Sequence, residues 1–339
     1  MKTIVLQEPG RFVAEARESI RACAAGEARV KIRRIGVCGT DLHAFEGDQP
    51  FFKYPRVLGH ELGVEVAEVG KGVTGIAIGD YCAVEPYLNC GKCPACISGR
   101  TNCCEQLIVL GVHEDGGMAE SLVVPAGKLH RSDVLPLEHL ALVEMLSIGA
   151  HAVSRAAVKV QDKVLVVGAG PIGLSVSQFV KLAGAEPVVF ELDPSRRAFC
   201  EEFLGISTCV APTANPVAQL RELLNGAMPD IVFDATGSSR SMHQSFELVG
   251  TAGKLVFVGL VLGDIAFHNP EFHRKELTLM SSRNATAADF AYVIRMLEAG
   301  HINLTPWITH RAAFDDMIAT FPDWLDRDAG VVKAMIDLD

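Results

Sequence analysis

Lys163 to Val167 is a short apolar run that leads directly into Gly168-Ala-Gly170-Pro-Ile-Gly173, and this junction constrains the fold more than any other stretch. The following apolar-rich segment predicts a helix that ends near Gly184. In such a strand–turn–helix context the first glycine permits the turn, the second admits a pyrophosphate, and the third lets helix and strand pack closely. We therefore expect a dinucleotide phosphate at the helix N-terminus, bound by Gly168, Gly170, Pro171, Ile172 and Gly173.

The next predicted strand, 188–190, ends in Glu191, 18 residues after the third glycine. A carboxylate at this place accepts hydrogen bonds from an adenosine ribose and repels a 2′-phosphate, which favours NAD over NADP. Arg196 and Arg197 follow closely. A guanidinium there could stack on adenine or could tolerate the phosphate of NADP, so this preference has an alternative.

Strands and helices continue to alternate up to residue 280. Strands are predicted over 207–210, 230–234, 254–258 and 277–280, with helices over 215–225 and 239–249. This alternation predicts an α/β fold with a parallel, doubly wound sheet. Because ligands of such sheets lie at the carboxyl ends of the strands, we expect further cofactor contacts from Thr236, Val258, Gly259 and Leu260.

Both ends of the chain have a different pattern. Residues 1 to about 80 contain short alternating segments, such as 28–35 and 64–69, divided by glycines, which predicts a β-rich, barrel-like domain. An apolar segment over 138–160 predicts a helix. The tail predicts helices over 288–299 and 313–320 and a strand over 331–336, and we expect it to return to the first domain.

Length and charge limit the class of protein. The 339 residues suffice for two domains, and a net charge of -10 argues against nucleic acid or an anionic membrane as a partner. We see neither a signal peptide nor the ~18 apolar residues of a membrane span, and expect a soluble cytoplasmic protein.

Five of the ten cysteines lie within fifteen residues. In a reducing compartment such clustering indicates metal thiolates rather than disulfides. The spacing C-x2-C-x2-C-x7-C, with glycine and proline between the cysteines, predicts a tetrahedral structural zinc in a lobe over 85–110. Its expected ligands are Cys90, Cys93, Cys96 and Cys104, and we assign Cys103 no role.

The octapeptide Gly36-Val-Cys-Gly-Thr-Asp-Leu-His43 combines a thiol, a hydroxyl and an imidazole. Cys38 with Thr40 and His43 could supply a metal ligand and a proton exit, and Gly59-His60-Glu61 would add ligands from a separate segment. The alternative is a buried cysteine in a glycine-rich turn. Glu144 lies among apolar residues, so it is either paired, ligates a cation, or faces water from an exposed helix surface.

Together these segments resemble the zinc-containing medium-chain dehydrogenase/reductase family over nearly the whole chain. Within the family the chain resembles the polyol, threonine and sugar-acid branch, which has Glu rather than Cys as the third protein position near the metal. The stretches 48–60, 98–105, 111–117 and 282–286 are similar to those of a bacterial sugar-acid dehydrogenase of this family. One departure is that Val64 stands where the family usually has Gly, with Gly63 just before it, which puts the local strand geometry in question.

The resemblance implies a GroES-like catalytic domain from 1–150 and 286–339, and a Rossmann NAD-binding domain from 151–285. It implies two zinc ions per chain, one catalytic zinc being held by Cys38, His60 and either Glu61 or Glu144. Thr40 would take the alcohol proton and pass it through the cofactor ribose to His43. Arg283, Asn284 and His113 are candidates for substrate contact, and Arg283 equally for cofactor contact.

The reaction implied is reversible hydride transfer between NAD and a secondary alcohol of a sugar acid or polyol, of the L-galactonate kind. L-Threonine 3-dehydrogenase activity is the alternative within the same chemistry, and a catalytically inactive dinucleotide-binding structural or sensing protein is the alternative of another class. A homo-dimer or homo-tetramer is expected from the resemblance.

Overall fold

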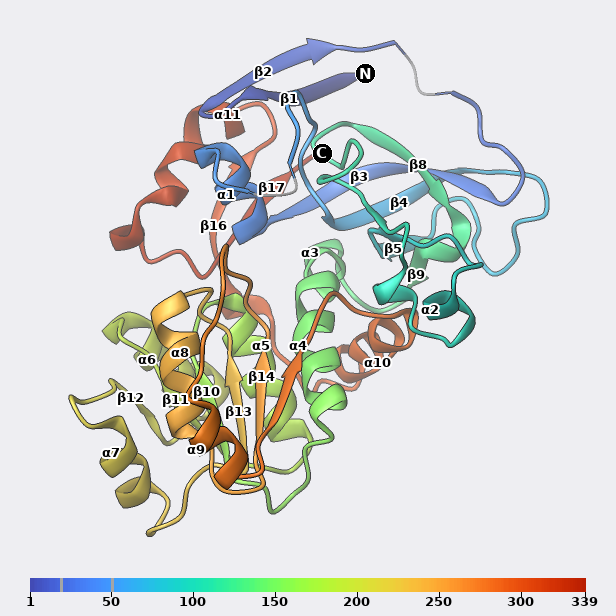
Figure 1. Ribbon diagram of the computed structural model, residues 1–339. Helices are drawn as coiled ribbons and strands as arrows, with labels where there is room; N and C mark the ends of the chain where they lie inside the picture. Colours follow the sequence, from blue (N-terminus) through green and yellow to red (C-terminus); the bar gives the residue numbers. More distant parts are fainter. Residues whose placement is uncertain (19–20, 50–51) are drawn as a thin grey trace. The chain divides into compact units, whose positions relative to one another are not determined.

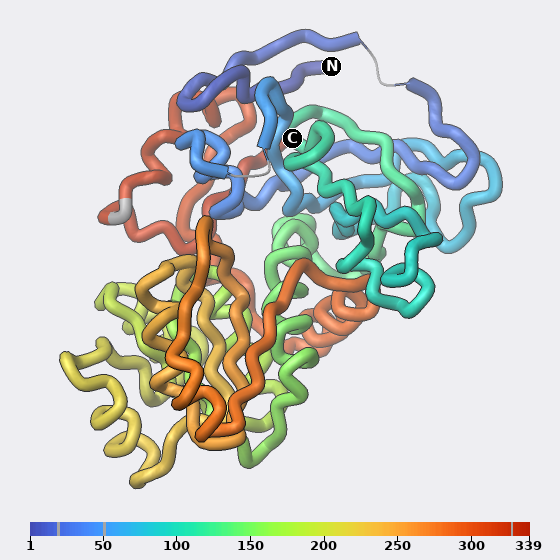
Figure 2. Tube along the Cα trace, in the orientation of Figure 1, coloured from blue at the N-terminus to red at the C-terminus, as the bar shows by residue number. Residues whose placement is uncertain are grey.

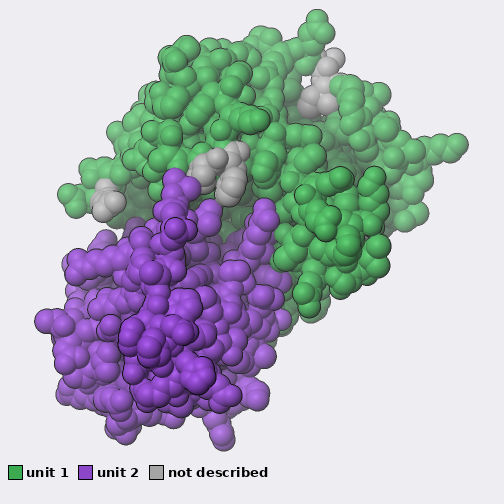
Figure 3. All heavy atoms as spheres, viewed as in Figure 1, with its two compact units in different colours: residues 1–147, 285–339 green, residues 148–284 purple. Residues whose placement is uncertain are grey.

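The computed structural model describes residues 1–18, 21–49 and 52–339. Pro50 and Phe51, within one of the stretches that carry the resemblance, lie outside the described residues. The chain divides into two compact units, coloured separately in Figure 3. Unit 1 comprises Met1–Ser147 and Ala285–Asp339, and unit 2 comprises Ile148–Asn284. Both ends of the chain therefore belong to unit 1, as the trace in Figure 2 also shows.

A seven-stranded sheet forms the centre of unit 1 (Figure 1). Its order is β16-β17-β3-β4-β5-β9, with β8 also paired to β3. Two further antiparallel pairs, β1–β2 and β6–β7, complete the unit. The strands are β1 Lys2–Glu8, β2 Arg11–Ala16, β3 Glu27–Val37, β4 Glu61–Val69, β5 Tyr81–Val84, β6 Tyr87–Leu88, β7 Ile108–Val109, β8 Ser121–Pro125, β9 Leu129–Arg131, β16 Ile308–Ala313 and β17 Lys333–Asp337.

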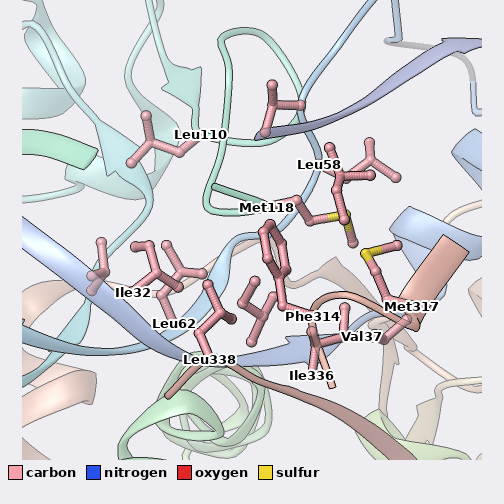
Figure 4. Close-up of a cluster of buried hydrophobic side chains, with 14 of the residues drawn as sticks. Ile32, Val37, Leu58, Leu62, Leu110, Met118, Phe314, Met317, Ile336 and Leu338 are labelled. Atoms are coloured by element: carbon pink, nitrogen blue, oxygen red, sulfur yellow. The ribbon is translucent and has the colours of Figure 1, made fainter. Parts of the chain in front are cut away.

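The side chains of β3 alternate as the sequence predicts. Val30 and Ile32 are buried, whereas Arg29 and Arg33 form ion pairs with carboxylates of β4. The buried face belongs to one apolar cluster to which distant segments contribute, among them Leu58, Leu62, Met118, Phe314, Met317 and Ile336 (Figure 4). Fully burying one such aliphatic side chain stabilises the fold by about 1.5–3 kcal/mol. Residues from both ends of the chain thus share a single core.

Gly63 explains the departure from the family pattern on β4. A Cβ atom on Gly63 would lie 2.0 Å from the carbonyl oxygen of Leu137, the first residue of α3 (Leu137–Ala141). The β3–β4 ladder also shifts register between Ile32 and Arg34, which pairs with Gly63. The glycine at this position lets α3 approach the strand, and the irregularity is a local bulge.

Two helical predictions need correction, and one helix was not predicted. The segment 138–160 forms two helices, α3 and α4 (Val143–Ala156), rather than one. In the tail, only α11 (Met317–Thr320) forms within 313–320, whereas α10 spans Ala287–Glu298 as expected. The octapeptide is helical from its fourth residue, because α1 spans Gly39–Glu46.

Unit 2 is a six-stranded sheet in which every pair is parallel, in the order β12-β11-β10-β13-β14-β15. The order runs outward in both directions from β10, so the crossover helices cover opposite faces, and the predicted doubly wound sheet is confirmed. The strands are β10 Val164–Val167, β11 Pro187–Phe190, β12 Cys209–Val210, β13 Ile231–Asp234, β14 Lys254–Phe257 and β15 Thr278–Ser281. The helices include α5 Pro171–Leu182, α6 Pro194–Leu204, α7 Pro216–Leu223, α8 Ser239–Leu248 and α9 Asn269–Arg274.

Among the described residues, no helix is both long and apolar enough to cross a membrane.

Candidate functional site

Helix α1 carries the residues of the octapeptide. Cys38 is its N-cap, and the backbone N–H of Cys38 donates to the Asp41 side chain (2.9 Å) in a capping box. Asp41 is buried and also accepts from the backbone N–H of Gly59 (3.3 Å), so it joins the start of α1 to the loop before β4. His43, one turn beyond Thr40, is exposed, and its Nδ1 lies 3.0 Å from the Asp48 carboxylate.

Pairing of β3 with β4 brings the predicted metal ligands together. Gly36 of β3 pairs with Glu61 of β4, so Cys38, just past the end of β3, lies beside His60 and Glu61. One ligand atom from each of these three residues lies within 4.8 Å of the others. Gly36 provides the space, since a Cβ atom there would lie 2.2 Å from Glu61 Oε2.

Lys333 of β17 is a residue that the sequence analysis did not identify. Its Nζ donates to Glu61 Oε1 (2.6 Å) and to the carbonyl oxygen of Val37 (3.1 Å), and both side chains of this ion pair are buried. Glu61 Oε2 is also buried and has no hydrogen-bond partner among the described residues. The ammonium group thus occupies one oxygen of Glu61 and leaves the other available.

Glu144 is buried in α4, so the exposed-face alternative is wrong. Its Oε1 accepts a hydrogen bond from the hydroxyl of Tyr87, which is buried in β6. Glu144 interacts electrostatically with His60 and Glu61 but lies outside the three-residue group defined above. Tyr87 is a second site residue that the sequence analysis missed.

Burial and neighbouring charges shift the pKa values of the side chains around the proposed metal site. Burial lowers the pKa of His60, but Asp41, Cys38 and Glu144 together raise it well above its ordinary value. Burial raises the pKa of Glu144, and burial with the Glu144 carboxylate raises that of Tyr87 well above its ordinary value. Several acidic groups therefore share a dry site, which favours a bound cation.

The residues present fit a zinc ion. A thiol, an imidazole and a carboxylate are three common zinc donors, and catalytic zinc sites have three protein ligands and one open position. Glu61 Oε2 is buried and has no hydrogen-bond partner among the described residues, whereas His60 Nδ1 lies 3.7 Å from the Asp41 carboxylate, which orients the imidazole. Cys38, His60 and Glu61 would hold the ion, with Glu144 beside them.

The four-cysteine lobe fits a second zinc ion. The sulfur atoms of Cys90, Cys93, Cys96 and Cys104 lie within 4.8 Å of one another, and Cys93 Sγ is 3.9 Å from Cys104 Sγ. Tetrahedral coordination at Zn–S of about 2.3 Å requires an S···S distance of about 3.8 Å. Backbone amides lower the pKa of Cys93 to about 6, as suits a thiolate. Cys103 is exposed and stands outside the group.

The glycine loop of unit 2 has the geometry of a phosphate site. Gly168 has φ +94°, and Gly170 is the N-cap of α5, followed by Pro171 at its first position. A Cβ atom on Gly173 would lie 1.9 Å from the Gly168 carbonyl oxygen, whereas one on Gly170 would meet only Arg196 Nη1 at 3.8 Å. The loop therefore leaves space at Gly170 in front of the first-turn amides of α5, which lack intrahelical partners.

Glu191 lies beside this loop. Its Oε2 accepts from the backbone N–H of Ala169 (2.6 Å) and its Oε1 from that of Asp193 (2.8 Å). Both bonds orient the carboxylate at the end of β11. The fold thus places both Glu191 and Arg196 next to the glycine loop.

The other predicted contacts are more dispersed. Thr236 and Gly259 follow β13 and β14, and both donate backbone hydrogen bonds to Asp234, Thr236 to its side chain (3.1 Å) and Gly259 to its carbonyl (3.1 Å). Val258 is half-buried and Leu260 exposed. The three candidates for substrate contact fall in different units: Arg283 and Asn284 in unit 2, where Asn284 has φ +51°, and His113, exposed, in unit 1.

Comparison with known proteins gives matches over most of the chain. Residues 24–134 match the alcohol dehydrogenase GroES-like domain, and residues 171–299 match the zinc-binding dehydrogenase family. The chain is 42% identical to L-galactonate-5-dehydrogenase of Escherichia coli K12, over 99% of this chain and 98% of that protein. The expected combination of a GroES-like domain and a Rossmann-type sheet is thereby confirmed.

Two solved structures share the fold over their whole length. An alcohol dehydrogenase from Escherichia coli CFT073, in complex with NADH, superimposes with a TM-score of 0.92 at 30% identity, covering 100% of this chain and 99% of that one. A zinc-binding dehydrogenase from Sinorhizobium meliloti 1021, bound to NADP, gives 0.90 at 28% identity, with 99% of each chain covered. Both nicotinamide dinucleotides thus occur among proteins of this fold.

Proposed function

We propose, since this chain belongs to the zinc-binding alcohol dehydrogenase family, that it reversibly oxidises a secondary alcohol of a sugar acid or polyol with NAD. The observation that carries the proposal is the convergence of Cys38, His60 and Glu61 in a chain that also holds a dinucleotide-type glycine loop. Cys38→Ser should abolish turnover and leave NAD binding largely intact. Full activity of this variant would refute the metal mechanism.

In the proposed reaction, bound zinc and NAD would supply the Lewis acid and the hydride acceptor, and side chains of the protein would transfer the proton. Zinc bound at Cys38, His60 and Glu61 would supply a Lewis acid that lowers the pKa of the alcohol, and bound NAD would accept the hydride. Thr40 is proposed to take the hydroxyl proton. His43 lies one turn further along α1 and is exposed, so it can release a proton to solvent.

The NAD preference follows from Glu191. Its carboxylate is held by two backbone amides, and such an acid repels a 2′-phosphate. Arg196 beside Gly170 is proposed to contact the phosphates of the cofactor, and Arg283 is a further candidate. Kinetics with both cofactors decide the preference: Glu191→Ser should improve kcat/KM for NADP relative to NAD, and equal use of both cofactors by the wild type would refute it.

L-Galactonate is the substrate we propose, because the chain is similar over almost its entire length to an enzyme of that name. Arg283 and Asn284 are proposed to hold its hydroxyl or carboxylate groups, and His113 is a weaker candidate. A panel of sugar acids, polyols and L-threonine, scored by NADH formation at 340 nm, is the test. L-Threonine turning over far faster than L-galactonate would replace this substrate with the alternative.

A non-catalytic dinucleotide-binding protein would lack catalytic ligands, yet all of Cys38, Thr40, His43, His60, Glu61 and Glu144 are present. We propose two zinc ions per chain, one of them at the four cysteines, where a reducing compartment such as the cytoplasm would maintain the thiolates. Metal analysis that found one zinc per chain would support the non-catalytic alternative.

A homo-dimer or homo-tetramer is proposed to form through the edge of the unit 2 sheet. β15 is the last strand of that sheet, and Leu279 on it is 41% exposed. An unpaired strand edge is a template for pairing with a second copy. Light scattering after size-exclusion chromatography should give a multiple of 36.4 kDa, and the monomer mass would refute the proposal.

A further inference from the structure

The hydrogen bond between Tyr87 and Glu144 joins two segments of unit 1 that are far apart in the sequence. Tyr87 is 3% exposed and Glu144 5% exposed, so the bond is shielded from water. A hydrogen bond to an ionised group is shorter and stronger than one between neutral groups, and a buried carboxylate without a donor is costly. Tyr87 is therefore the residue whose removal would affect Glu144 most directly.

Glu144 needs such a restraint because of its surroundings. It interacts electrostatically with His60 and Glu61, but it does not belong to the group that these residues form with Cys38. Both carboxylates are already engaged elsewhere: Lys333 binds one oxygen of Glu61, and Tyr87 binds one oxygen of Glu144. Two buried carboxylates beside the same candidate metal site thus have separate partners.

The position of Tyr87 is set by the four-cysteine lobe. Tyr87 and Leu88 form β6, which pairs with β7, and Cys90 follows two residues later. Between them, Asn89 donates to Cys96 Sγ (3.6 Å) and accepts from Lys128 (2.9 Å). The four-cysteine lobe therefore fixes β6 at its Leu88 end, and Tyr87 is the residue at the opposite end of this strand.

The Tyr87 ring has a further fixed contact. It packs edge-on against Phe290 of α10, with ring centroids 6.3 Å apart and an interplanar angle of 81°. Phe290 is itself fully buried and stacks on His130, which lies 3.0 Å from the buried Glu85 carboxylate. A buried ring that packs against Phe290 leaves its hydroxyl little freedom to follow a moving carboxylate.

We propose that Tyr87 is a positioning residue that keeps Glu144 outside the Cys38–His60–Glu61 group, and that the four-cysteine lobe fixes Tyr87 for this purpose. The inference rests on the proposed function, since it assigns the three-residue group a zinc ion. It gives the lobe a role beyond stability: an intact lobe keeps Glu144 from joining the zinc ligands, and so keeps the open position for the alcohol.

The test is a double-mutant cycle with Tyr87→Phe, Glu144→Gln and both changes together. The readout is the rate at which zinc leaves the proposed catalytic site for a chelator, measured without substrate, while the four-cysteine zinc serves as the retained reference. Freed from Tyr87, Glu144 would become an additional ligand. Tyr87→Phe should therefore slow release about tenfold, as about 1.4 kcal/mol would, and have no effect in the Glu144→Gln background.

Unchanged or faster release from Tyr87→Phe would overturn the inference, as would an equal change in both backgrounds. Tyr81→Phe is the matched control, because Tyr81 is 45% exposed in the same unit and should release zinc at the wild-type rate. Urea unfolding of the wild type, the two single variants and the double variant provides a second measurement. If the losses in free energy of unfolding of the two single variants add up to that of the double variant, the inference is also overturned. Failure of the proposed function would be recognised separately, because the wild-type protein would then show no dehydrogenase activity.

Discussion

Replacing Lys333 with Met should destabilise unit 1 more than any change to a surface charge. Lys333 is 2% exposed and Glu61 is fully buried, so the substitution leaves a carboxylate in a dry site without its ammonium partner. Breaking a buried ion pair by removing one partner costs about 3–5 kcal/mol. The Val37 carbonyl oxygen loses the hydrogen bond from Lys333 as well.

Urea unfolding followed by tryptophan fluorescence measures this loss in the correct part of the protein. The two tryptophans of the chain, Trp307 and Trp324, are both buried in unit 1. At a slope of roughly 3 kcal/mol/M for a unit of this size, the midpoint of Lys333→Met should fall by about 1–2 M. All variants are compared as zinc-free proteins prepared with a chelator, because Glu61 is a proposed zinc ligand and bound zinc would add to the measured stability.

Two further variants make the prediction refutable. Lys31→Met removes an ammonium group that is 52% exposed and 3.7 Å from Glu65, and it should change stability by less than about 0.5 kcal/mol. Glu61→Gln combined with Lys333→Met leaves no unpaired buried charge and should recover most of the loss. A cost below about 1 kcal/mol for Lys333→Met, or a double variant less stable than the single one, would refute the unpaired buried charge as the cause.

Three other changes have defined outcomes. Cys104→Ser should remove one zinc per chain and lower the thermal midpoint, as measured by metal analysis and calorimetry, whereas Cys103→Ser should change neither. Gly173→Ala places a Cβ atom 1.9 Å from a backbone carbonyl oxygen and should weaken NADH binding at least tenfold in a fluorescence titration. Arg21 lowers the pKa of Glu27 from 4.5 to about 2, so this pair stabilises the fold above pH 4.5 and the contribution disappears as the pH falls toward 2. Glu27→Gln should therefore cost up to about 1 kcal/mol at pH 7 and progressively less below pH 4.

Each of these has a contradicting result. Gly127→Ala is the control for the glycine change, because a Cβ atom there would meet nothing within 4 Å. Equal NADH affinity of the two alanine variants would contradict the close-packing explanation. A zinc content unaffected by Cys104→Ser would contradict the four-cysteine site, and a constant effect of Glu27→Gln from pH 7 to pH 3 would contradict the ion-pair origin of its contribution.

The parts of the structure that the sequence predicts well are those determined by neighbours in the chain. The loop Gly168–Gly173 and the cysteines 90, 93, 96 and 104 form from single short segments, so spacing alone conveys their geometry. The octapeptide is the exception. Two glycines there indicate a turn, yet Asp41 caps a helix, because its carboxylate accepts from the Cys38 amide.

Tyr87 and Lys333 could not be found in this way. Their hydrogen-bond partners are 57 and 272 residues distant, and neither residue stands in a recognisable motif. The one available signal was a lysine within the apolar run 331–336, since a charged residue on a buried strand requires a partner. The sequence does not reveal which carboxylate that partner is, because the pairing of β17 with β3 selects it.

That pairing also sets an order for the synthesis of the protein. β17 lies between β16 and β3 inside the unit 1 sheet, although it is synthesised after both of the strands it pairs with. Unit 2 is continuous from Ile148 to Asn284 and can fold as soon as it has emerged, whereas β3 must wait for a neighbour almost three hundred residues later. A nascent or truncated chain that ends before β17 would thus present an exposed edge on β3 and a Glu61 without its ammonium partner, so unit 1 is completed only after β17 has been synthesised.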